Sequence, residues 1–179
     1  MAPAMKGCPS QDMCKEGLLV DTRIRDHGPL DEQPVVELAL RAWAPVFSSL
    51  EQVLGREIFV RLHGEWRQYQ EKAVRDTLAD DATQVWVAEA APGVVGFVAA
   101  KLHPERQLGE IWMLAVDPDA QGRGIGSALT EVATGWLREA GMTVAMVETG
   151  GDPGHARARR VYEKANYTVL PVARYFKAL

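Results

Sequence analysis

The segment from Leu108 to Gly141 constrains the fold more than any other part of the chain. Residues 108–116 are rich in strand formers, and the run ends at Asp117-Pro118 because proline cannot donate to a sheet ladder. A glycine-rich loop, Gln121-Gly-Arg-Gly-Ile-Gly126, follows at once. Apolar residues then recur at helical spacing from Ile125 to Leu137, and Gly141 supplies a helix stop. The pattern predicts a strand, a tight loop and an amphipathic helix in direct succession.

The glycine loop lies where a protein binds anions well. The first N–H groups of a helix lack partners and carry partial positive charge, and glycines let phosphate oxygens approach the backbone. A Walker loop is excluded because no lysine follows Gly126, and the dinucleotide fingerprint fails because Ser127 and Leu129 stand where a further glycine is required. The loop therefore predicts a pyrophosphate site of another type. A glycine turn that only permits close packing is the alternative.

The remaining segments alternate between helical and strand-like patterns. Pro92-Gly93 joins two strands as an antiparallel hairpin. Gly55 and Gly64 weaken a long helical stretch, so we expect a break near one of them. The expected strands are 18–25, 84–89, 94–102, 108–116, 143–148, 167–170 and 172–176, and the expected helices are 31–46, 49–78, 125–137 and 155–165.

Composition bounds the class of protein. The chain has 179 residues, 47% of them hydrophobic, which fits one α/β domain; we expect residues 18–179 to form it and residues 1–17 to be flexible. The net charge of -4 argues against a nucleic-acid partner. Cys8 and Cys14 lack metal-ligand spacing and are interpreted as free thiols; no metal site is expected. No signal peptide and no apolar run of about 18 residues is found, so we expect a cytoplasmic protein with no membrane contact.

The glycine loop and its flanks resemble the GNAT superfamily of acetyltransferases, whose acetyl-CoA motif is Gln/Arg-x-x-Gly-x-Gly/Ala. Upstream, Leu114-Ala-Val-Asp-Pro118 resembles the end of the family's fourth strand. Downstream, Tyr162-Glu-Lys-Ala-Asn-Tyr167 resembles its Tyr-x-Lys-x-Gly-Phe segment. The resemblance covers residues 18–179. It implies a layered α/β fold in which a central, mostly antiparallel twisted sheet is flanked by helices and opens where strands 4 and 5 splay apart to admit CoA.

The resemblance also implies acetyl-CoA as the co-substrate. The backbone N–H of Leu114 would stabilise the oxyanion, and Val116 would pair with the pantetheine arm. His155 stands where the family often has asparagine, and Asn166 stands where it has glycine. The implied cofactor-binding residues are Leu114, Ala115, Val116, Gln121, Gly122, Arg123, Gly124, Ile125, Gly126, Ser127 and His155.

Acetyl transfer from a thioester to an amine needs a base, because alkyl amines are mostly protonated at neutral pH. Glu110 is the candidate, with a solvated strand-end carboxylate as the alternative. Regular alternation would place Glu110, Trp112, Leu114 and Val116 on one face, and a bulge would break that pattern. Tyr162 is the candidate acid for the leaving thiolate, with an ordinary core tyrosine as the alternative. The resemblance supports both assignments.

The other histidines, His27, His63 and His103, are isolated in the sequence and are interpreted as surface or loop residues. His63 lies in the helical stretch that the resemblance places beside the acceptor cleft, together with Trp66 and Tyr69; core packing is the alternative for these aromatics. The arginines of residues 157–160 could reach the CoA 3′-phosphate or could form a solvated helix face.

The sequence thus predicts an acetyl-CoA-dependent N-acetyltransferase. Direct transfer in a ternary complex is expected, because no cysteine lies near the site to carry an acyl intermediate. The acceptor is predicted to be a small-molecule primary amine, with a protein or peptide amine as the alternative. A non-catalytic acetyl-CoA-binding module is a rival that the presence of both Glu110 and Tyr162 argues against. The sequence leaves both a monomer and a homodimer open.

Overall fold

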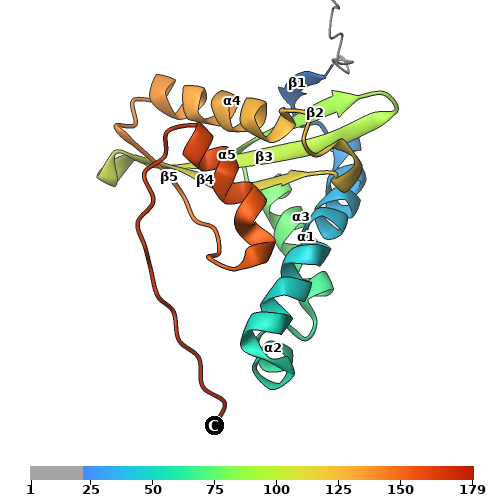
Figure 1. Cartoon of the computed structure of the whole chain (residues 1–179). Coiled ribbons are helices and arrows are strands. Elements are labelled where there is room, and N and C mark those ends of the chain that lie inside the picture. The colour runs from blue at the N-terminus through green and yellow to red at the C-terminus, as the bar shows by residue number, and fades with distance from the viewer. Residues whose placement is uncertain (1–21) are drawn as a thin grey trace, which may run out of the picture.

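The computed structural model describes residues 22–179, so the predicted lead-in with Cys8 and Cys14, and the start of the first predicted strand, lie outside the described residues. Five strands form one sheet in the order β1-β2-β3-β4-β5 (Figure 1). The first four pair antiparallel, and β5 runs parallel to β4. The predicted α/β fold with a mostly antiparallel sheet is confirmed. The strands are β1 (Arg23–Asp26), β2 (Thr83–Ala90), β3 (Gly93–His103), β4 (Leu108–Val116) and β5 (Val144–Val147).

Helices cover both faces of the sheet (Figure 1). On one face lie α1 (Glu32–Leu54) and α3 (Trp66–Ala79), joined by the short α2 (Arg56–His63). The other face is covered by α4 (Ile125–Glu139), and α5 (Ala156–Lys164) packs beside the start of α4. Short 3-10 turns precede α1 and α5 and follow β3 and β4: η1 (Pro29–Asp31), η4 (Pro153–His155), η2 (Pro104–Arg106) and η3 (Pro118–Ala120).

The helical region breaks at the predicted glycines, but it lacks the interruption that the sequence predicts after residue 46. An interruption between residues 46 and 49 is expected, whereas α1 continues to Leu54 with Pro45 inside it. Gly55 ends α1 with a φ of 74°, a conformation that glycine adopts without the penalty of a side chain. Gly64 then separates α2 from α3, so both glycines interrupt the stretch for which one break is predicted.

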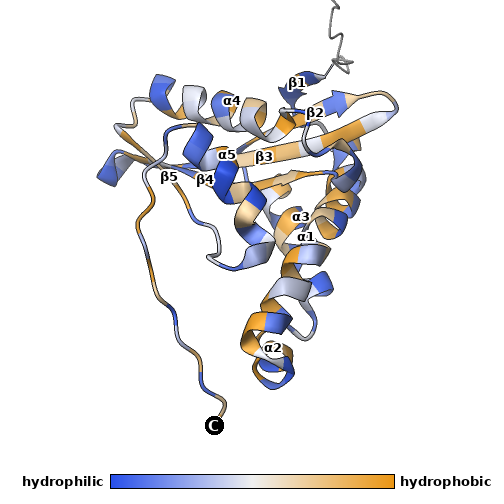
Figure 2. Ribbon diagram, viewed as in Figure 1, coloured by the Kyte–Doolittle hydropathy of each residue, from blue (hydrophilic) through white to orange (hydrophobic). Residues whose placement is uncertain are grey.

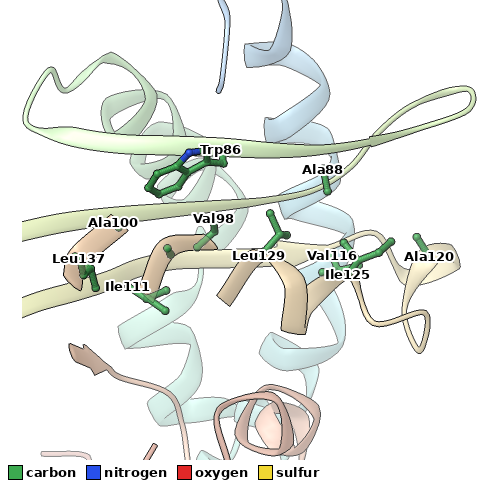
Figure 3. Close-up of a cluster of buried hydrophobic side chains, with 11 residues drawn as sticks. Trp86, Ala88, Val98, Ala100, Ile111, Val116, Ala120, Ile125, Leu129 and Leu137 are labelled. Atoms are coloured by element: carbon green, nitrogen blue, oxygen red, sulfur yellow. The ribbon is translucent and has the colours of Figure 1, made fainter. Parts of the chain in front are cut away.

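Alternation along the central strands divides the buried side chains into two cores, one on each face of the sheet. The α4 core includes Trp86, Val98, Ala100, Ile111, Ile125, Leu129 and Leu137 (Figure 3). The α1–α3 core includes Val35, Leu38, Val74, Val87, Phe97 and Ala99. Leu129 and Phe97 are completely buried, and each such side chain stabilises the fold by about 1.5–3 kcal/mol. Figure 2 shows the apolar strands between helices whose outer surfaces are largely polar.

A bulge in β4 changes which core its side chains enter. Ala99 of β3 pairs with Met113 and Ala100 pairs with Ile111, so Trp112 has no partner in β3. Trp112 instead donates a hydrogen bond from Nε1 to Thr77 Oγ1 of α3 at 3.2 Å.

The predicted common face of Glu110, Trp112, Leu114 and Val116 is therefore wrong. Met113 packs in the α1–α3 core, whereas Leu114 and Val116 pack in the α4 core. Glu110 and Trp112 lie on the α1–α3 face because Ile111, between them, enters the α4 core. One extra residue has placed the Glu110 side chain on the opposite sheet face from the side chains of Leu114 and Val116.

The two last predicted strands, 167–170 and 172–176, do not form. Residues 167–179 take no strand pairing with any described strand, and the segment leaves the body of the domain in Figure 1. Its side chains Val169, Leu170 and Tyr175 are exposed, and Arg174 reaches Glu148 at 3.5 Å. Strand-forming residues need a neighbouring strand for their backbone hydrogen bonds, and this segment has none in residues 22–179.

Candidate active site

The sheet opens at its β4–β5 edge. β5 pairs with β4 only from Leu108 to Ile111, whereas β4 continues to Val116. Beyond the opening, the N–H of Asp117 donates to Val95 O of β3 at 2.9 Å. Because successive N–H groups of a strand point to opposite sides, the N–H groups of Val116 and Leu114 point away from β3, toward the opening. The two backbone groups that the sequence assigns to the acyl and pantetheine moieties therefore lie on the splayed edge.

The N-terminus of α4 lies directly after this edge. Gly122 and Gly124 have φ angles of 81° and 83°, which let the backbone turn tightly without a side-chain penalty. The N–H of Ala128 makes the first helical bond, to Gly124 O at 3.0 Å, and no side chain caps the helix. The N–H groups of residues 125–127 consequently have no hydrogen-bond partner within residues 22–179. Such a terminus is available to an anion.

Side chains border this glycine loop. Gln121 donates from Nε2 to Val116 O at 3.0 Å and accepts from Arg157 of α5. A Cβ on Gly126 would meet Val161 of α5 at 3.5 Å, an ordinary contact, so α5 forms one wall of the loop. Arg159 is engaged elsewhere, since it donates to the carbonyl oxygens of Gly150 and Asp152 at 2.6 and 2.9 Å. Of the predicted basic cluster, Arg157 is the one beside the loop.

The predicted base, Glu110, is held by a histidine. Glu110 Oε2 lies 2.9 Å from His103 Nε2, and the two side chains are 14% and 34% exposed. Lys101, directly opposite Glu110 in the ladder, instead donates to Asp80 at 3.1 Å and lies over the Trp112 ring. Glu110 is thus not a freely solvated carboxylate. The interpretation of His103 as an isolated histidine is wrong, because the hairpin brings it against a carboxylate seven residues further on.

The predicted acid, Tyr162, faces inward from α5 and is 8% exposed. Burial raises the pKa of Tyr162 to about 12, with the nearby Tyr167 as a smaller cause. The phenol therefore keeps its proton at neutral pH. Its hydroxyl has no hydrogen-bond partner among residues 22–179, whereas the Tyr167 hydroxyl is bonded to Thr134 Oγ1 at 2.8 Å.

His155 is fixed in the loop between β5 and α5. Its Nδ1 contacts Asp152 Oδ1, while Asp152 Oδ2 accepts from Ser49 Oγ of α1 at 2.8 Å. The Gly154 N–H donates to both Ser49 Oγ and Asp152 Oδ2 at 2.9 Å. Burial raises the pKa of Asp152, but the hydrogen bonds from Ser49 and His155 outweigh it, so that the pKa lies below its usual value. This cluster ties the loop to α1, and the contact of His155 with CoA stays a prediction.

The residues His63, Trp66 and Tyr69 meet in a hollow of about 170 Å³ that Phe47, Leu62 and Gln70 complete. Phe47 stacks on Trp66 with ring centroids 4.3 Å apart, and burial lowers the pKa of His63. Trp66 begins α3, and Thr77, which contacts Trp112, lies eleven residues later. The hollow is therefore about 16 Å along α3 from the β4 bulge. Its use by an acceptor stays a prediction.

Two further findings apply to the part of the chain that the structure describes. None of its helices is long and apolar enough to cross a membrane. Nor does a group of three or more His, Cys, Asp or Glu side chains that could hold a metal ion occur between residues 22 and 179.

A mostly antiparallel sheet that opens between β4 and a parallel β5, with an uncapped glycine-lined helix at the opening, defines a GNAT-type acyltransferase fold. The chain belongs to the acetyltransferase (GNAT) family, whose sequence profile matches residues 48–167. The superfamily resemblance drawn from the glycine loop is confirmed.

Relatives with named activities are longer than this chain. Mycothiol acetyltransferase of Saccharomonospora viridis is 38% identical over 119 residues, which make up 60% of this chain and 38% of the relative. Mycothiol acetyltransferase of Thermomonospora curvata is 26% identical over 178 residues, or 94% of this chain and 57% of the relative. The chain thus spans roughly 40 to 60% of the length of these two relatives.

Solved structures with the same fold act on different acceptors. An aminoglycoside acetyltransferase from an uncultured soil metagenomic sample, in complex with trehalose, matches with a TM-score of 0.59 at 18% identity over 88% of this chain and 96% of that one. The ribosomal-protein-S18-alanine N-acetyltransferase of Escherichia coli matches with a TM-score of 0.57 at 18% identity over 80% and 76%. At these identities the likeness establishes the fold alone.

Proposed function

We propose that this protein is an acetyl-CoA-dependent N-acetyltransferase that moves an acetyl group directly to a primary amine of a small molecule. The observation that carries the proposal is the division of β4. Within residues 22–179, its C-terminal half presents N–H groups that no strand pairs with, beside the uncapped start of α4, and its N-terminal half presents the Glu110 carboxylate. Family membership supports acetyl-CoA as the donor. Residues 18–179 are proposed to form the catalytic domain.

The proposed cofactor site uses mostly backbone. The diphosphate would accept hydrogen bonds from the N–H groups of the loop Gln121, Gly122, Arg123, Gly124, Ile125, Gly126 and Ser127. The pantetheine arm would run along Leu114, Ala115 and Val116, where β4 lacks a neighbouring strand on the β5 side. His155 would border it from the β5–α5 loop. The Leu114 N–H would donate to the carbonyl oxygen as negative charge develops there.

In the proposed reaction Glu110 removes one proton from the acceptor ammonium, either directly or through water. The free amine then attacks the thioester carbon, so that a C–N bond forms and the carbonyl oxygen becomes an oxyanion. Collapse of this intermediate breaks the C–S bond. The nitrogen's second excess proton ends on sulfur, and the products are an amide and the CoA thiol.

The high pKa of Tyr162 refines its proposed role. Proton transfer from a phenol of pKa about 12 to a thiolate whose conjugate acid has a pKa of about 8.5 is uphill by about 5 kcal/mol. A hydrogen bond from the protonated phenol to the departing thiolate has no such cost. We therefore assign to Tyr162 the stabilisation of the thiolate while the nitrogen proton is delivered.

The names of the relatives support a small-molecule acceptor. Mycothiol and aminoglycosides are the substrate classes in the names of the sequence relatives and of one structural neighbour. A protein or peptide acceptor is the second candidate, supported by the neighbour that acetylates a ribosomal protein. A non-catalytic acetyl-CoA-binding module is the third.

Ligand-dependent melting tests the cofactor, and thiol release tests the acceptor. Acetyl-CoA at 1,000 times its Kd should stabilise the fold by about 4 kcal/mol, or about 8–16 °C in Tm, while NAD and ATP shift it far less. A shift with NAD and none with acetyl-CoA would contradict the cofactor assignment. Thiol release from acetyl-CoA is then measured with matched pools of small amines and peptides. Faster release with the small amines is expected, whereas binding without release in any pool favours the non-catalytic module.

A further inference from the structure

The contact between Glu110 and His103 is built into the β3–β4 hairpin. His103 is the last residue of β3 and pairs with Leu108, while Glu110 pairs with Lys101, so His103 and Glu110 are diagonal neighbours on one face. The turn Pro104–Arg106 and Gln107, which has a φ of 48°, fix this register. The 2.9 Å approach of the imidazole to the carboxylate therefore follows from strand pairing.

The surrounding charges leave His103 as the polar partner of Glu110. Lys101 is directed to Asp80, and hydrogen bonds from Thr83 and Lys101 lower the pKa of Asp80 to about 2. On the other side of β4, Glu110 pairs with Met146 of β5, which is uncharged. Within residues 22–179, Glu110 makes no other side-chain hydrogen bond or ion pair than the one to His103.

His103 is more exposed to solvent than Glu110. The Glu110 side chain is 14% exposed, whereas that of His103 is 34% exposed and lies at the end of β3, beside a solvent-exposed turn. A base that collects a proton in each turnover must release it before the next one. The more exposed imidazole offers the shielded carboxylate a route to water.

We propose that His103 is the positioning residue of this enzyme, which orients the Glu110 carboxylate and accepts its proton after each amine deprotonation. The inference rests on the proposed function, in which Glu110 is the base. The acceptor ammonium transfers one proton to the Glu110 carboxylate, giving a free amine and a carboxylic acid. While the carboxylate is ionised, Nε2–H of neutral His103 donates to it and holds its orientation. After Glu110 has taken the ammonium proton, the ring exchanges protons with water to its Nδ1–H tautomer, and Nε2 then accepts the proton of the carboxylic acid. The imidazolium formed releases its Nδ1 proton to water, which restores the carboxylate and the Nε2–H tautomer.

General acid strengths favour this direction of transfer. An imidazole is in general a stronger base than a carboxylate, so a carboxylic acid can pass its proton to an imidazole that it contacts. The carboxylate is thereby restored at neutral pH without direct access to bulk water. Without the imidazole, the proton must leave through the small exposed part of Glu110.

Variants of the full chain test the proposal, with the amine that gives the fastest thiol release as acceptor. His103→Gln keeps a hydrogen-bond donor but accepts no proton, and it should lower kcat about 10-fold at pH 7 with unchanged affinity for acetyl-CoA. His103→Ala should lose somewhat more activity and should recover part of it in added imidazole. Arg106→Gln, in the exposed turn next to His103, is the matched control and should match the parent enzyme, with no response to imidazole.

The pH profile separates a relay from simple packing. If His103 carries the proton away from Glu110, the pH profile of kcat should change its shape in His103→Gln, and kcat should be lower than in the parent enzyme. A His103→Gln enzyme with the parent's rate and profile, and no imidazole rescue of His103→Ala, would overturn the relay. If Glu110→Gln also kept full activity, the proposed base itself would be wrong. If His103→Ala melts far below the parent, His103→Gln carries the test.

Discussion

The two halves of β4 present different kinds of chemical group. Its C-terminal half presents backbone N–H groups at the splayed edge and leads into the glycine loop before α4, and these groups depend little on side-chain identity. Its N-terminal half, on the side of α1 and α3, offers the side chains of Glu110 and Trp112 and the neighbouring His103. Cofactor binding should therefore respond to changes in backbone geometry and local charge, whereas chemistry on the amine should respond to the loss of single side chains.

The largest expected loss of activity follows from a substitution in the N-terminal half of β4. Glu110→Gln removes a positioned base and should lower kcat by about 10² to 10⁴-fold, with acetyl-CoA affinity nearly unchanged. The loss should shrink as pH rises, because free amine then becomes abundant in solution. Steady-state rates from pH 6 to 10, together with calorimetric titration of acetyl-CoA, measure both effects.

Tyr162→Phe supplies the contrast to that variant. It removes a hydrogen bond to the departing thiolate, so its rate deficit should stay constant where that of Glu110→Gln declines. Full activity of Glu110→Gln at pH 7 would assign the base to another group. Parallel pH profiles for the two variants would contradict the assignment of separate roles to Glu110 and Tyr162.

The next largest effect is a loss of acetyl-CoA affinity from a substitution in the glycine loop that follows β4. Gly126→Asp places a carboxylate at the uncapped start of α4, where phosphate oxygens are proposed to bind, and should weaken acetyl-CoA binding about 100-fold or more. Gly126→Ala is the matched control, because a Cβ there meets Val161 at an ordinary 3.5 Å and adds no charge. Equal affinities of the two variants in calorimetric titration would contradict the anion site.

The smallest expected effect concerns the link between α1 and the β5–α5 loop, where Ser49 donates to Asp152. Ser49→Ala should lower the free energy of unfolding at pH 7 by about 1–2 kcal/mol, because it removes a bond to a buried carboxylate. Since the folded pKa of Asp152 is lowered, its stabilising contribution is present above pH 4 and is lost as pH falls through the folded value.

The difference between Ser49→Ala and the parent should therefore narrow in urea unfolding below pH 4. Ser48→Ala is the control, because Ser48 is exposed and bonds only the Ala44 carbonyl of its own helix. A deficit for Ser49→Ala that stays equal at pH 3 and pH 7 would show that the lost bond does not depend on the charge of Asp152.

The sequence alone predicts correctly those elements that neighbouring residues in the chain determine. The glycine loop with its following helix, and the Pro92-Gly93 hairpin, are encoded by residues that are adjacent in the chain, and both occur where predicted. The fold class came from the resemblance of the glycine loop and its flanks to the GNAT superfamily. The uncapped, glycine-lined start of α4 could be predicted for the same reason, since helix starts and glycine turns are determined within a few residues.

Features that depend on distant neighbours were missed. The residues around Ser49 do not indicate that α1 continues past it. The Ser49 side chain donates its hydrogen bond to Asp152, which is 103 residues away in the sequence. Residues 167–176 have the composition of strands but no strand to pair with. The partner of His103 depends on the register of the hairpin, and the face of Glu110 depends on a bulge that local composition does not reveal.

The bulge at Trp112 also has a consequence for how this scaffold can diversify. Because one unpaired residue resets the alternation, positions 110, 112 and 113 face α1 and α3, while positions 114 and 116 face α4. Substitutions at the former positions leave the latter in register, so, under the proposed function, acceptor preference and cofactor affinity can change separately within one nine-residue strand. Deletion of Trp112 would restore regular alternation along β4, and the side chains on both sides of the deletion would keep the faces that they have now.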